Sequence, residues 1–211
     1  MTRILIADDH TIVREGLKQI LAETSDMVVA GEATNGQEVI DEVLKNSYDV
    51  VLLDISMPGR NGLDVLKQLK IENPGISVLI LSMYAEEQYA MRALRAGAAG
   101  YMTKESAPDE LIQALRKVSQ GRKYISPTLA EKLALNLEGG DEQNPPHENL
   151  SDREYQVFCM IASGKMIKEI ADELSLSVKT VSTYRSRILE KMGLKNNAAL
   201  THYAIQNRLV E

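Results

Sequence analysis

The sequence predicts two domains, an α/β domain built on a doubly wound parallel sheet and a smaller all-α domain that follows it. Three observations support this organisation. Short apolar runs alternate with stretches of helical spacing through the first ~120 residues. The segment Glu138–Asn149 has no apolar residue except proline, and from Leu150 onward every periodic segment is helical. A chain of 211 residues is long enough to form two separate cores.

Five apolar runs in the first domain are typical of strands buried on both faces of a sheet. They are Ile4–Ala7, Val28–Ala30, Val50–Leu53, Val78–Leu81 and the weaker Ala99–Met102. Stretches of helical spacing follow them, beginning at Ile12, Val39, Leu63, Met91 and Leu111. Strands that alternate with helices in this way pair in parallel through right-handed crossovers. The expected fold is therefore a flavodoxin-like (βα)5 doubly wound parallel sheet with helices on both faces.

A polar stretch separates the two domains. Ser126-Pro127 opens one more helical segment, expected over residues 127–137, because proline is tolerated at the first position of a helix. The following Glu138–Asn149 has the composition of a linker. The predicted organisation is residues 1–120 for the sheet domain, 121–148 for the linker with its helix, and 149–211 for the helical domain.

Composition excludes several classes of protein. The longest apolar runs fall far short of the ~20 residues that span a bilayer. The N-terminus has no extended apolar signal region, and the single Cys159 cannot form an internal disulfide. We therefore expect a cytoplasmic protein that does not contact a membrane.

The net charge of −6 is unevenly distributed. Residues 149–211 carry nine Lys/Arg and seven Asp/Glu, which leaves a net charge of −8 on residues 1–148. Five basic residues and one acid fall within Ser177–Lys195. An acidic domain joined to a locally basic one is expected of a sensor joined to a DNA-binding domain.

Polar side chains stand at the carboxyl ends of four predicted strands. The pair Asp8-Asp9 follows the first strand, Asp54 the third, and Ser82 ends the fourth. Lys104 follows the fifth strand. Binding sites in open parallel sheets form at this edge, so these side chains should converge. Three carboxylates repel one another unless a cation lies among them, and Mg²⁺ prefers such oxygen ligands.

Each of these residues also has a purely structural interpretation. The alternatives are helix caps for Asp8 or Asp9 and for Ser82, a solvated loop lysine at Lys104, a packed strand aromatic at Tyr101 and a plain turn at Met57-Pro58. His10 is expected in the first turn of a helix. Because the structural interpretations would have to coincide at the ends of four strands, we favour a functional site.

The combination suits phosphoryl transfer to a carboxylate. Asp54 can act as a nucleophile and form an aspartyl-phosphate. The metal and Lys104 would stabilise the phosphoryl oxygens as their charge redistributes. This would explain why the buried strand Val50–Leu53 is followed by an acid, since Asp54 would bind the metal and accept the phosphoryl group.

These motifs resemble the receiver domains of two-component response regulators over the whole of the first ~120 residues. The matching motifs are Asp8-Asp9, Asp54-x-x-Met57-Pro58-x-x-x-Gly62, Ser82 and Tyr101-x-x-Lys104. One departure is Glu105, which stands where many members have proline.

The resemblance implies a role for each matching residue. Asp54 would accept a phosphoryl group from a sensor histidine kinase. Asp9, Asp54 and the backbone carbonyl of Ser56 would bind Mg²⁺, with Asp8 acting partly through water. Lys104 and Ser82 would contact the phosphoryl group. Tyr101 would swing inward and couple the site to the surface around the fourth helix.

The C-terminal domain has the pattern of a helix-turn-helix. Its four helical segments are Asp152–Ala162, Ile167–Leu174, Val178–Met192 and Asn197–Gln206. Ser151 and Glu154 fit a capping box. The three residues between the second and third segments give helix-turn-helix spacing, which leaves the third helix free to enter a major groove.

A helical wheel of Val178–Met192 separates two faces. The inward positions are Val181, Tyr184, Ile188 and Met192, with Leu189 beside them. The candidate DNA-binding residues are Lys179, Thr180, Ser182, Thr183, Arg185, Ser186 and Arg187. Hydroxyl groups allow a close approach to base edges, and the cations suit phosphate contacts. The alternative is a solvated basic face without a DNA partner.

This domain looks like the LuxR-type helix-turn-helix of NarL/FixJ response regulators. The matching motifs are Leu150-Ser151-x-Arg153-Glu154, Lys168-Glu169-Ile170-Ala171, Lys179-Thr180-Val181 and Lys191-Met192-Gly193. The family usually has histidine at the position of Tyr184. In the family the last helix, here Asn197–Gln206, commonly forms the dimer contact on DNA; the alternative is packing on its own domain.

The predicted function is a transcription regulator that binds double-stranded promoter DNA, switched by phosphorylation of Asp54 and active as a homodimer. RNA polymerase is a further candidate partner, and the chain is not expected to be a stand-alone metabolic enzyme. One alternative is an aspartyl-phosphate phosphatase, which would want an acid at Ser56. The others are a phosphorylation-independent regulator or adaptor and a promoter reader similar to a sigma factor, which the N-terminal half does not suit.

Overall fold

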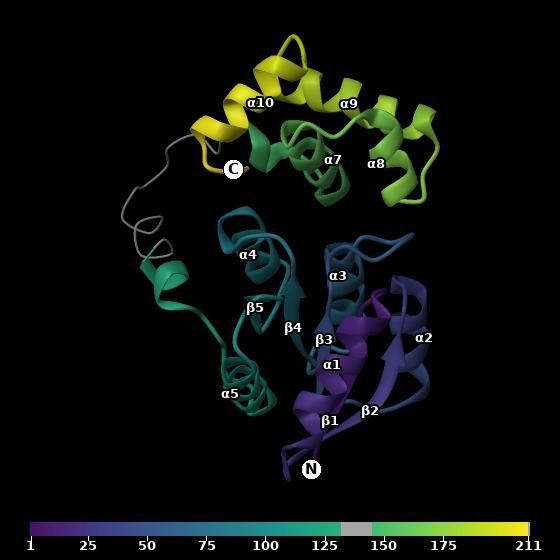
Figure 1. Cartoon of the computed structure of the whole chain (residues 1–211), viewed down its shortest axis with the longest axis vertical. Coiled ribbons are helices and arrows are strands. Elements are labelled where there is room, and N and C mark those ends of the chain that lie inside the picture. The colour runs from purple at the N-terminus through teal and green to yellow at the C-terminus, as the bar shows by residue number, and fades with distance from the viewer. Residues whose placement is uncertain (132–144, 211) are drawn as a thin grey trace. The chain divides into compact units, whose positions relative to one another are not determined.

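The structure is a computed structural model that describes residues 1–131 and 145–210. The chain divides into two compact units, Met1–Leu129 and Ala130–Glu211 (Figure 1). The first unit takes in residues 121–129, which the sequence prediction assigned to the linker. The helix expected over 127–137 is helical at 127–131, and the rest of it lies outside the described residues.

The first unit is a five-stranded parallel sheet with helices between its strands. Its elements are β1 (Thr2–Ala7), α1 (Thr11–Ala22), β2 (Met27–Ala33), α2 (Gly36–Lys45), β3 (Val50–Leu53), α3 (Gly62–Glu72), β4 (Ser77–Ser82), α4 (Glu86–Arg95), β5 (Gly100–Thr103) and α5 (Pro108–Ser119). The strand order is β2-β1-β3-β4-β5, and every pairing is parallel. This confirms the predicted fold class and puts the topological switch point between β1 and β3.

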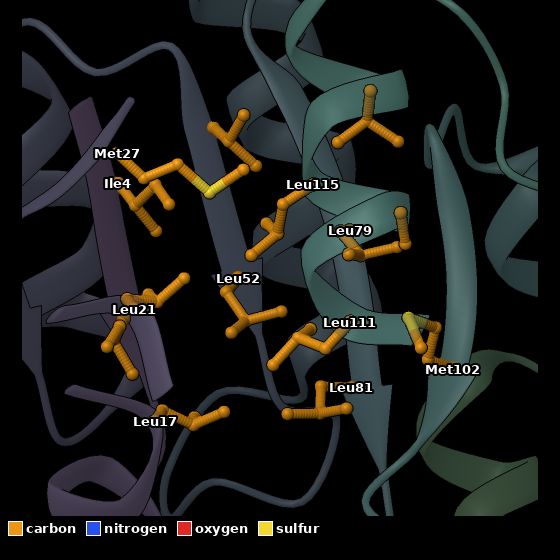
Figure 2. Packing of buried hydrophobic residues seen from close by; sticks show 14 of the residues in the cluster. Ile4, Leu17, Leu21, Met27, Leu52, Leu79, Leu81, Met102, Leu111 and Leu115 are labelled. Atoms are coloured by element: carbon orange, nitrogen blue, oxygen red, sulfur yellow. The ribbon is translucent and has the colours of Figure 1, made fainter. Parts of the chain in front are cut away.

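The core on one face of the sheet is filled by α1 and α5. Figure 2 shows Leu21 of α1 near Ile4 of β1, and Leu111 and Leu115 of α5 near Leu52 and Leu79 of the sheet. Alternate strand residues point to the opposite face of a sheet. All four residues of β3 are fully buried, so the strand that leads to Asp54 is covered on both sides.

Local capping explains where several helices begin. The side chain of Asn35 accepts hydrogen bonds from the backbone N–H groups of Gln37 and Glu38 at the start of α2. The prediction for His10 was wrong, because α1 begins at Thr11. His10 has an extended backbone conformation (φ −84°, ψ 107°) in the position before the helix.

The segment after α5 returns to the free edge of β5. The backbone N–H of Tyr124 donates to the carbonyl of Ala99 at 2.8 Å, and Tyr124 forms a parallel bridge with Gly100. The hydroxyl of Ser126 donates to Glu86 of α4 at 2.6 Å. Leu129 is buried. These contacts explain why the first compact unit extends beyond α5.

The described part of the second unit has helices and no strand, as predicted. Its described elements are η1 (Pro146–Asn149), a 3-10 helix, and the α-helices α7 (Asp152–Ala162), α8 (Ile167–Glu173), α9 (Val178–Met192) and α10 (Asn197–Gln206). The capping box of Ser151 and Glu154 is confirmed. Gly193 ends α9 in the left-handed conformation, at φ 65°. None of the helices in the described part of the chain combines the length and apolarity needed to cross a bilayer.

Gly62 and Gly16 make a matched pair for testing how tightly the loop after β3 is packed. A Cβ at Gly62 would lie 2.3 Å from the carbonyl oxygen of Asp54 and 2.7 Å from the Cα of Ile55, whereas a Cβ at Gly16 in α1 would have nothing within 4 Å. We expect Gly62→Ala to lower the free energy of unfolding by about 2 kcal/mol or more. Gly16→Ala should raise it by about 0.5–1 kcal/mol, because alanine favours a helix interior. Urea unfolding measures both changes, and equal effects would contradict the packing described.

Candidate functional site

Two buried carboxylates lie side by side at the switch point of the sheet. Asp8 comes directly after β1 and Asp54 directly after β3, and each is 2% exposed. The backbone N–H of Asp54 donates to the carbonyl of Ala7 at 2.9 Å, which continues the pairing of the two strands. The N–H of Asp8 donates to the carbonyl of Ala33 in β2 at 3.1 Å. Sheet pairing therefore fixes the backbone from which both acids project.

Lys104 lies between these two carboxylates. Its Nζ is 2.6 Å from Oδ2 of Asp8 and 2.7 Å from Oδ2 of Asp54. The side chain is 5% exposed, so it is not the solvated loop lysine of the structural interpretation. The N–H of Lys104 donates to the carbonyl of Ser82 at 2.8 Å, which holds the residue at the end of β5. One cation thus links the ends of three strands.

Burial and charge act in opposite directions on the acid–base groups of the cluster. Burial raises the pKa of the Asp54 carboxyl above its usual range, and the attraction of Lys104 only partly offsets this. Burial by itself would lower the pKa of Lys104, but the nearby charges and hydrogen bonds of Asp54 and Asp8 outweigh it, and the pKa is raised. The ionised form of Asp54 is therefore costly in the free protein.

Asp9 supplies a carboxylate that the other residues leave unsatisfied. Its Oδ1 is buried and has no hydrogen-bond partner within the described structure. The ring Nδ1 of His10 lies 3.0 Å from that oxygen and 3.2 Å from Oδ1 of Asp8, without a hydrogen bond to Asp9. Ligand atoms of Asp8, Asp9, His10 and Asp54 all lie within 4.8 Å of one another. An unsatisfied oxygen among mostly carboxylate donors fits a hard divalent cation such as Mg²⁺.

Ser56 also lies beside the cluster. Its backbone N–H donates to Oδ1 of Asp54 at 3.1 Å. Together with Lys104 on Oδ2, this contact leaves both oxygens of Asp54 with one hydrogen-bond donor each. The carboxylate is thus held in one orientation before any ligand arrives.

Ser82 and Tyr101 meet at the segment between β4 and α4. The fully buried Ser82 accepts a hydrogen bond from the N–H of Tyr84 at 3.2 Å. It does not cap α4, whose N-cap residue is Ala85. The hydroxyl of Tyr101 donates to the carbonyl of Tyr84 at 2.7 Å, and its ring is fully buried. Burial raises the pKa of this phenol, so it remains a donor at neutral pH. Tyr84 is therefore held by both predicted switch residues.

Arg14, which was not among the predicted site residues, lies beside the acidic pair. The Nη1 of Arg14 donates to the carbonyl of Asp8 at 2.8 Å. A signal was available, because a cation in the first turns of a helix opposes the helix dipole and calls for a compensating partner. Arg14 is such a cation in α1.

The predicted DNA-binding residues divide by exposure along α9. The exposed ones are Lys179, Ser182, Thr183, Ser186 and Arg187. Thr180 and Arg185 are half-buried. The Nε of Arg185 donates to the side chain of Asn197 in α10 at 2.6 Å. In this structure Arg185 therefore ties two helices together rather than projecting freely.

The outward hydroxyls of α9 are oriented by the helix itself. Thr183 donates to the carbonyl of Lys179 at 2.9 Å, and Ser186 donates to that of Ser182 at 3.1 Å. Because their protons are used, the hydroxyl oxygens face outward as hydrogen-bond acceptors. Base-edge donors such as the amino groups of cytosine and adenine would suit them.

The inner side of α9 fixes that face in place. Val181, Ile188 and Met192 are buried as predicted, and Tyr184 is half-buried. The Nζ of Lys191 lies 2.6 Å from Oε2 of the nearly buried Glu154 at the start of α7. Burial would raise the pKa of the Glu154 carboxyl, but the hydrogen bond from Lys191 and those from Ser151 outweigh it and the pKa is lowered. The buried apolar side chains of α9 and the ion pair of Lys191 with Glu154 therefore fix α9 within its domain.

Comparisons with known proteins agree with both halves of this description. A family model described as a response regulator receiver domain matches residues 4–116, and one described as bacterial regulatory proteins of the luxR family matches residues 148–204. The chain is 38% identical over 211 residues to the response regulator GacA of Pseudomonas aeruginosa. The alignment covers 100% of this chain and 99% of GacA.

Two solved structures of RcsB extend the likeness to three dimensions. RcsB of Salmonella enterica serovar Typhimurium, bound to promoter rprA with the phosphomimetic BeF3⁻, is 29% identical with a TM-score of 0.67. The match covers 96% of this chain and 97% of that one. A structure of two RcsB dimers bound to two parallel DNAs is 28% identical with a TM-score of 0.59, covering 97% and 98% of the two chains.

Replacing Asp54 by asparagine should stabilise the protein in Mg²⁺-free buffer. The pKa of Asp54 is raised in the folded state, so its ionised form costs folding free energy above that pKa. We expect Asp54→Asn to raise the free energy of unfolding at pH 7, because the neutral amide carries no buried charge. The gain should shrink as the pH falls through the folded pKa towards 3.8, the value of an unperturbed Asp. Urea unfolding at several pH values measures it.

Asp26→Asn is the control, because it should lower the free energy of unfolding at pH 7 where Asp54→Asn raises it. A hydrogen bond from Arg116 lowers the pKa of Asp26 below its usual range. Its carboxylate therefore contributes stability above pH 3.8, the value of an unperturbed Asp, and this is lost as the pH falls through the folded pKa. Destabilisation by Asp54→Asn at pH 7 would contradict the account of the cluster.

Proposed function

This chain belongs to the NarL/FixJ family of response regulators, which join a receiver domain to a LuxR-type helix-turn-helix domain. We propose that it is a DNA-binding transcription regulator and that Mg²⁺-dependent phosphorylation of Asp54 switches it. The observation that carries the proposal is the ammonium group of Lys104 between Asp8 and Asp54, beside the unsatisfied oxygen of Asp9. The cluster combines a nucleophile, a counter-charge and one unsatisfied carboxylate oxygen, that of Asp9, at the switch point of the sheet.

The phosphoryl donor is a sensor histidine kinase. A carboxylate oxygen of Asp54 attacks the phosphorus of a phosphohistidine as the P–N bond breaks, and the bonding electrons stay on the imidazole nitrogen. Asp8, Asp9, Asp54 and the carbonyl of Ser56 would hold Mg²⁺, which supplies positive charge that offsets the carboxylates and the phosphoryl group. Lys104, which now contacts Asp54, moves to a phosphoryl oxygen.

The switch runs through Ser82 and Tyr101. When the hydroxyl of Ser82 donates to the phosphoryl group, its oxygen is drawn away from the N–H of Tyr84. The other anchor of Tyr84 is the hydroxyl of Tyr101, so a shift of Tyr84 moves the segment that leads into α4. A local change of charge is thus passed to the surface around α4.

The output is promoter binding by a homodimer through α9. The exposed cations Lys179 and Arg187 contact phosphates, and the hydroxyls of α9 face base edges. Paired α9 helices would enter half-sites about one helical turn apart. The RcsB structures on promoter DNA and as DNA-bound dimers support this part of the proposal. RNA polymerase is a candidate further partner.

The receiver performs its own phosphoryl transfer and dephosphorylation and is not a stand-alone metabolic enzyme. We place its action in the bacterial cytoplasm, where the chromosome lies.

Phosphorylation by a small donor tests the site. Incubation of the full chain with acetyl phosphate and Mg²⁺ should add one phosphoryl group by intact mass, and none without Mg²⁺. Asp54→Ala should abolish the addition, because it removes the nucleophile. Asp109→Ala, which removes an exposed acid at the start of α5, should be phosphorylated like the wild type. Phosphorylation of Asp54→Ala at the wild-type level would contradict the assignment.

Salt dependence tests the DNA-binding face. Lys179→Ala should weaken binding to a random-sequence duplex and reduce the slope of log K against log salt by about 1, because one phosphate contact is lost. Arg208→Ala is the control, since it removes an exposed cation that lies after α10. Fluorescence anisotropy over a range of KCl concentrations measures both slopes. An unchanged slope for Lys179→Ala would remove that residue from the interface.

A further inference from the structure

We propose that Arg14 is a positioning residue for the metal site, which acts by fixing the peptide between Asp8 and Asp9. The inference rests on the proposed Mg²⁺-dependent function and adds a residue outside the motif that carries it. Arg14 does not touch a reacting atom. It acts through the backbone that aims the carboxylate of Asp9.

The need for such a residue follows from how differently the two acids are held. The carboxylate of Asp8 is fixed by Lys104 on one oxygen and by the backbone N–H of His10, at 2.8 Å, on the other. Asp9 is 31% exposed, and its buried Oδ1 has no hydrogen bond within the described structure. The ring Nδ1 of His10 lies 3.0 Å from that oxygen without a hydrogen bond to it, so the direction of the carboxylate depends on its backbone.

Arg14 holds that backbone at the carbonyl that joins the two acids. Its Nη1 donates to the carbonyl oxygen of Asp8 at 2.8 Å. This oxygen belongs to the planar peptide that also carries the N–H of Asp9. Holding the carbonyl therefore fixes the plane from which Asp9 projects. A charge-assisted hydrogen bond from a guanidinium is among the stronger contacts available for this purpose.

The guanidinium is itself held from a second side. Its Nε lies 3.2 Å from Oε2 of Glu32 in β2, and its side chain is only 11% exposed. The other oxygen of Glu32 accepts a hydrogen bond from Lys18 at 2.9 Å. The fork of an arginine can donate to a carbonyl and a carboxylate at once in fixed geometry, which the single ammonium of a lysine cannot reproduce. Arg14 thus ties the acidic loop to both α1 and β2.

Charge alone predicts the opposite effect from positioning. A cation close to a metal site repels the metal, so removal of a purely electrostatic Arg14 would tighten Mg²⁺ binding. Removal of a positioning residue would weaken it, because Asp9 would no longer point at the metal. The sign of the change therefore separates the two roles.

Isothermal titration of the full chain with MgCl₂ measures that sign without phosphoryl transfer. We expect Arg14→Met and Arg14→Lys each to weaken Mg²⁺ binding by about tenfold. This is the lower end of the loss in metal affinity, roughly 10–100-fold, found when a contact outside the ligand shell is removed. Lys18→Met is the matched control, since it lies one turn further along α1 and loses a contact to the same Glu32. It should bind Mg²⁺ like the wild type.

Phosphorylation by acetyl phosphate adds a second readout. The Mg²⁺ concentration for half-maximal rate should rise about tenfold in both Arg14 variants, in line with the dissociation constant from the titration. The rate at saturating Mg²⁺ should stay close to that of the wild type. Thermal melts without Mg²⁺ identify any variant that does not fold, and Arg14→Lys keeps the charge and stem if Arg14→Met fails.

Three results would overturn the inference. They are unchanged or tighter Mg²⁺ binding in both Arg14 variants, full rescue by Arg14→Lys, and an equal loss in Lys18→Met. Failure of the wild-type chain to bind Mg²⁺ at all would instead overturn the proposed function on which the inference rests.

Discussion

The ion pairs that Lys104 makes with two buried carboxylates are the contact on which the arrangement of the receiver site depends. Asp8, Asp54 and Lys104 follow β1, β3 and β5, so a single ammonium group links strands that are not all neighbours in the sheet. Burying two acids this close together is unfavourable without a cation. The lysine offsets this cost in the free protein, and the unsatisfied oxygen of Asp9 remains as a ligand atom for a second cation.

This arrangement gives the site two states that differ in the partners of the same few groups. In the free protein Lys104 neutralises Asp54, and Ser82 holds the backbone of Tyr84. In the proposed phosphorylated protein, both would turn to the new phosphoryl oxygens. Since Tyr101 holds the other side of Tyr84, the exchange of partners reaches the start of α4. The hydrogen bond from Ser126 to Glu86 ties the segment after α5 to that same helix.

The parts of the fold that follow from local pattern were predictable. The continuous apolar run of β3 and the amphipathic α9 have the predicted bounds, because the pattern that predicts each lies within the segment itself. Contacts made to particular backbone groups were not predicted. The pairing of Tyr124 with β5 and the contact of Arg14 with the carbonyl of Asp8, six residues earlier, leave no periodicity in the sequence. The motif residues Asp8, Asp54 and Lys104 were predicted to converge because strand ends in a parallel sheet share one edge.

Hydrogen–deuterium exchange of the full chain with beryllofluoride tests most directly whether the charge at Asp54 controls the α4 surface. Beryllofluoride with Mg²⁺ imitates a phosphoryl group on a carboxylate, so no kinase is needed. We predict that exchange at Tyr84 and along α4 changes when beryllofluoride is added to the wild type with Mg²⁺, and that it does not change in Asp54→Asn. Identical exchange with and without beryllofluoride in the wild type, under conditions where the ligand is bound, would contradict it.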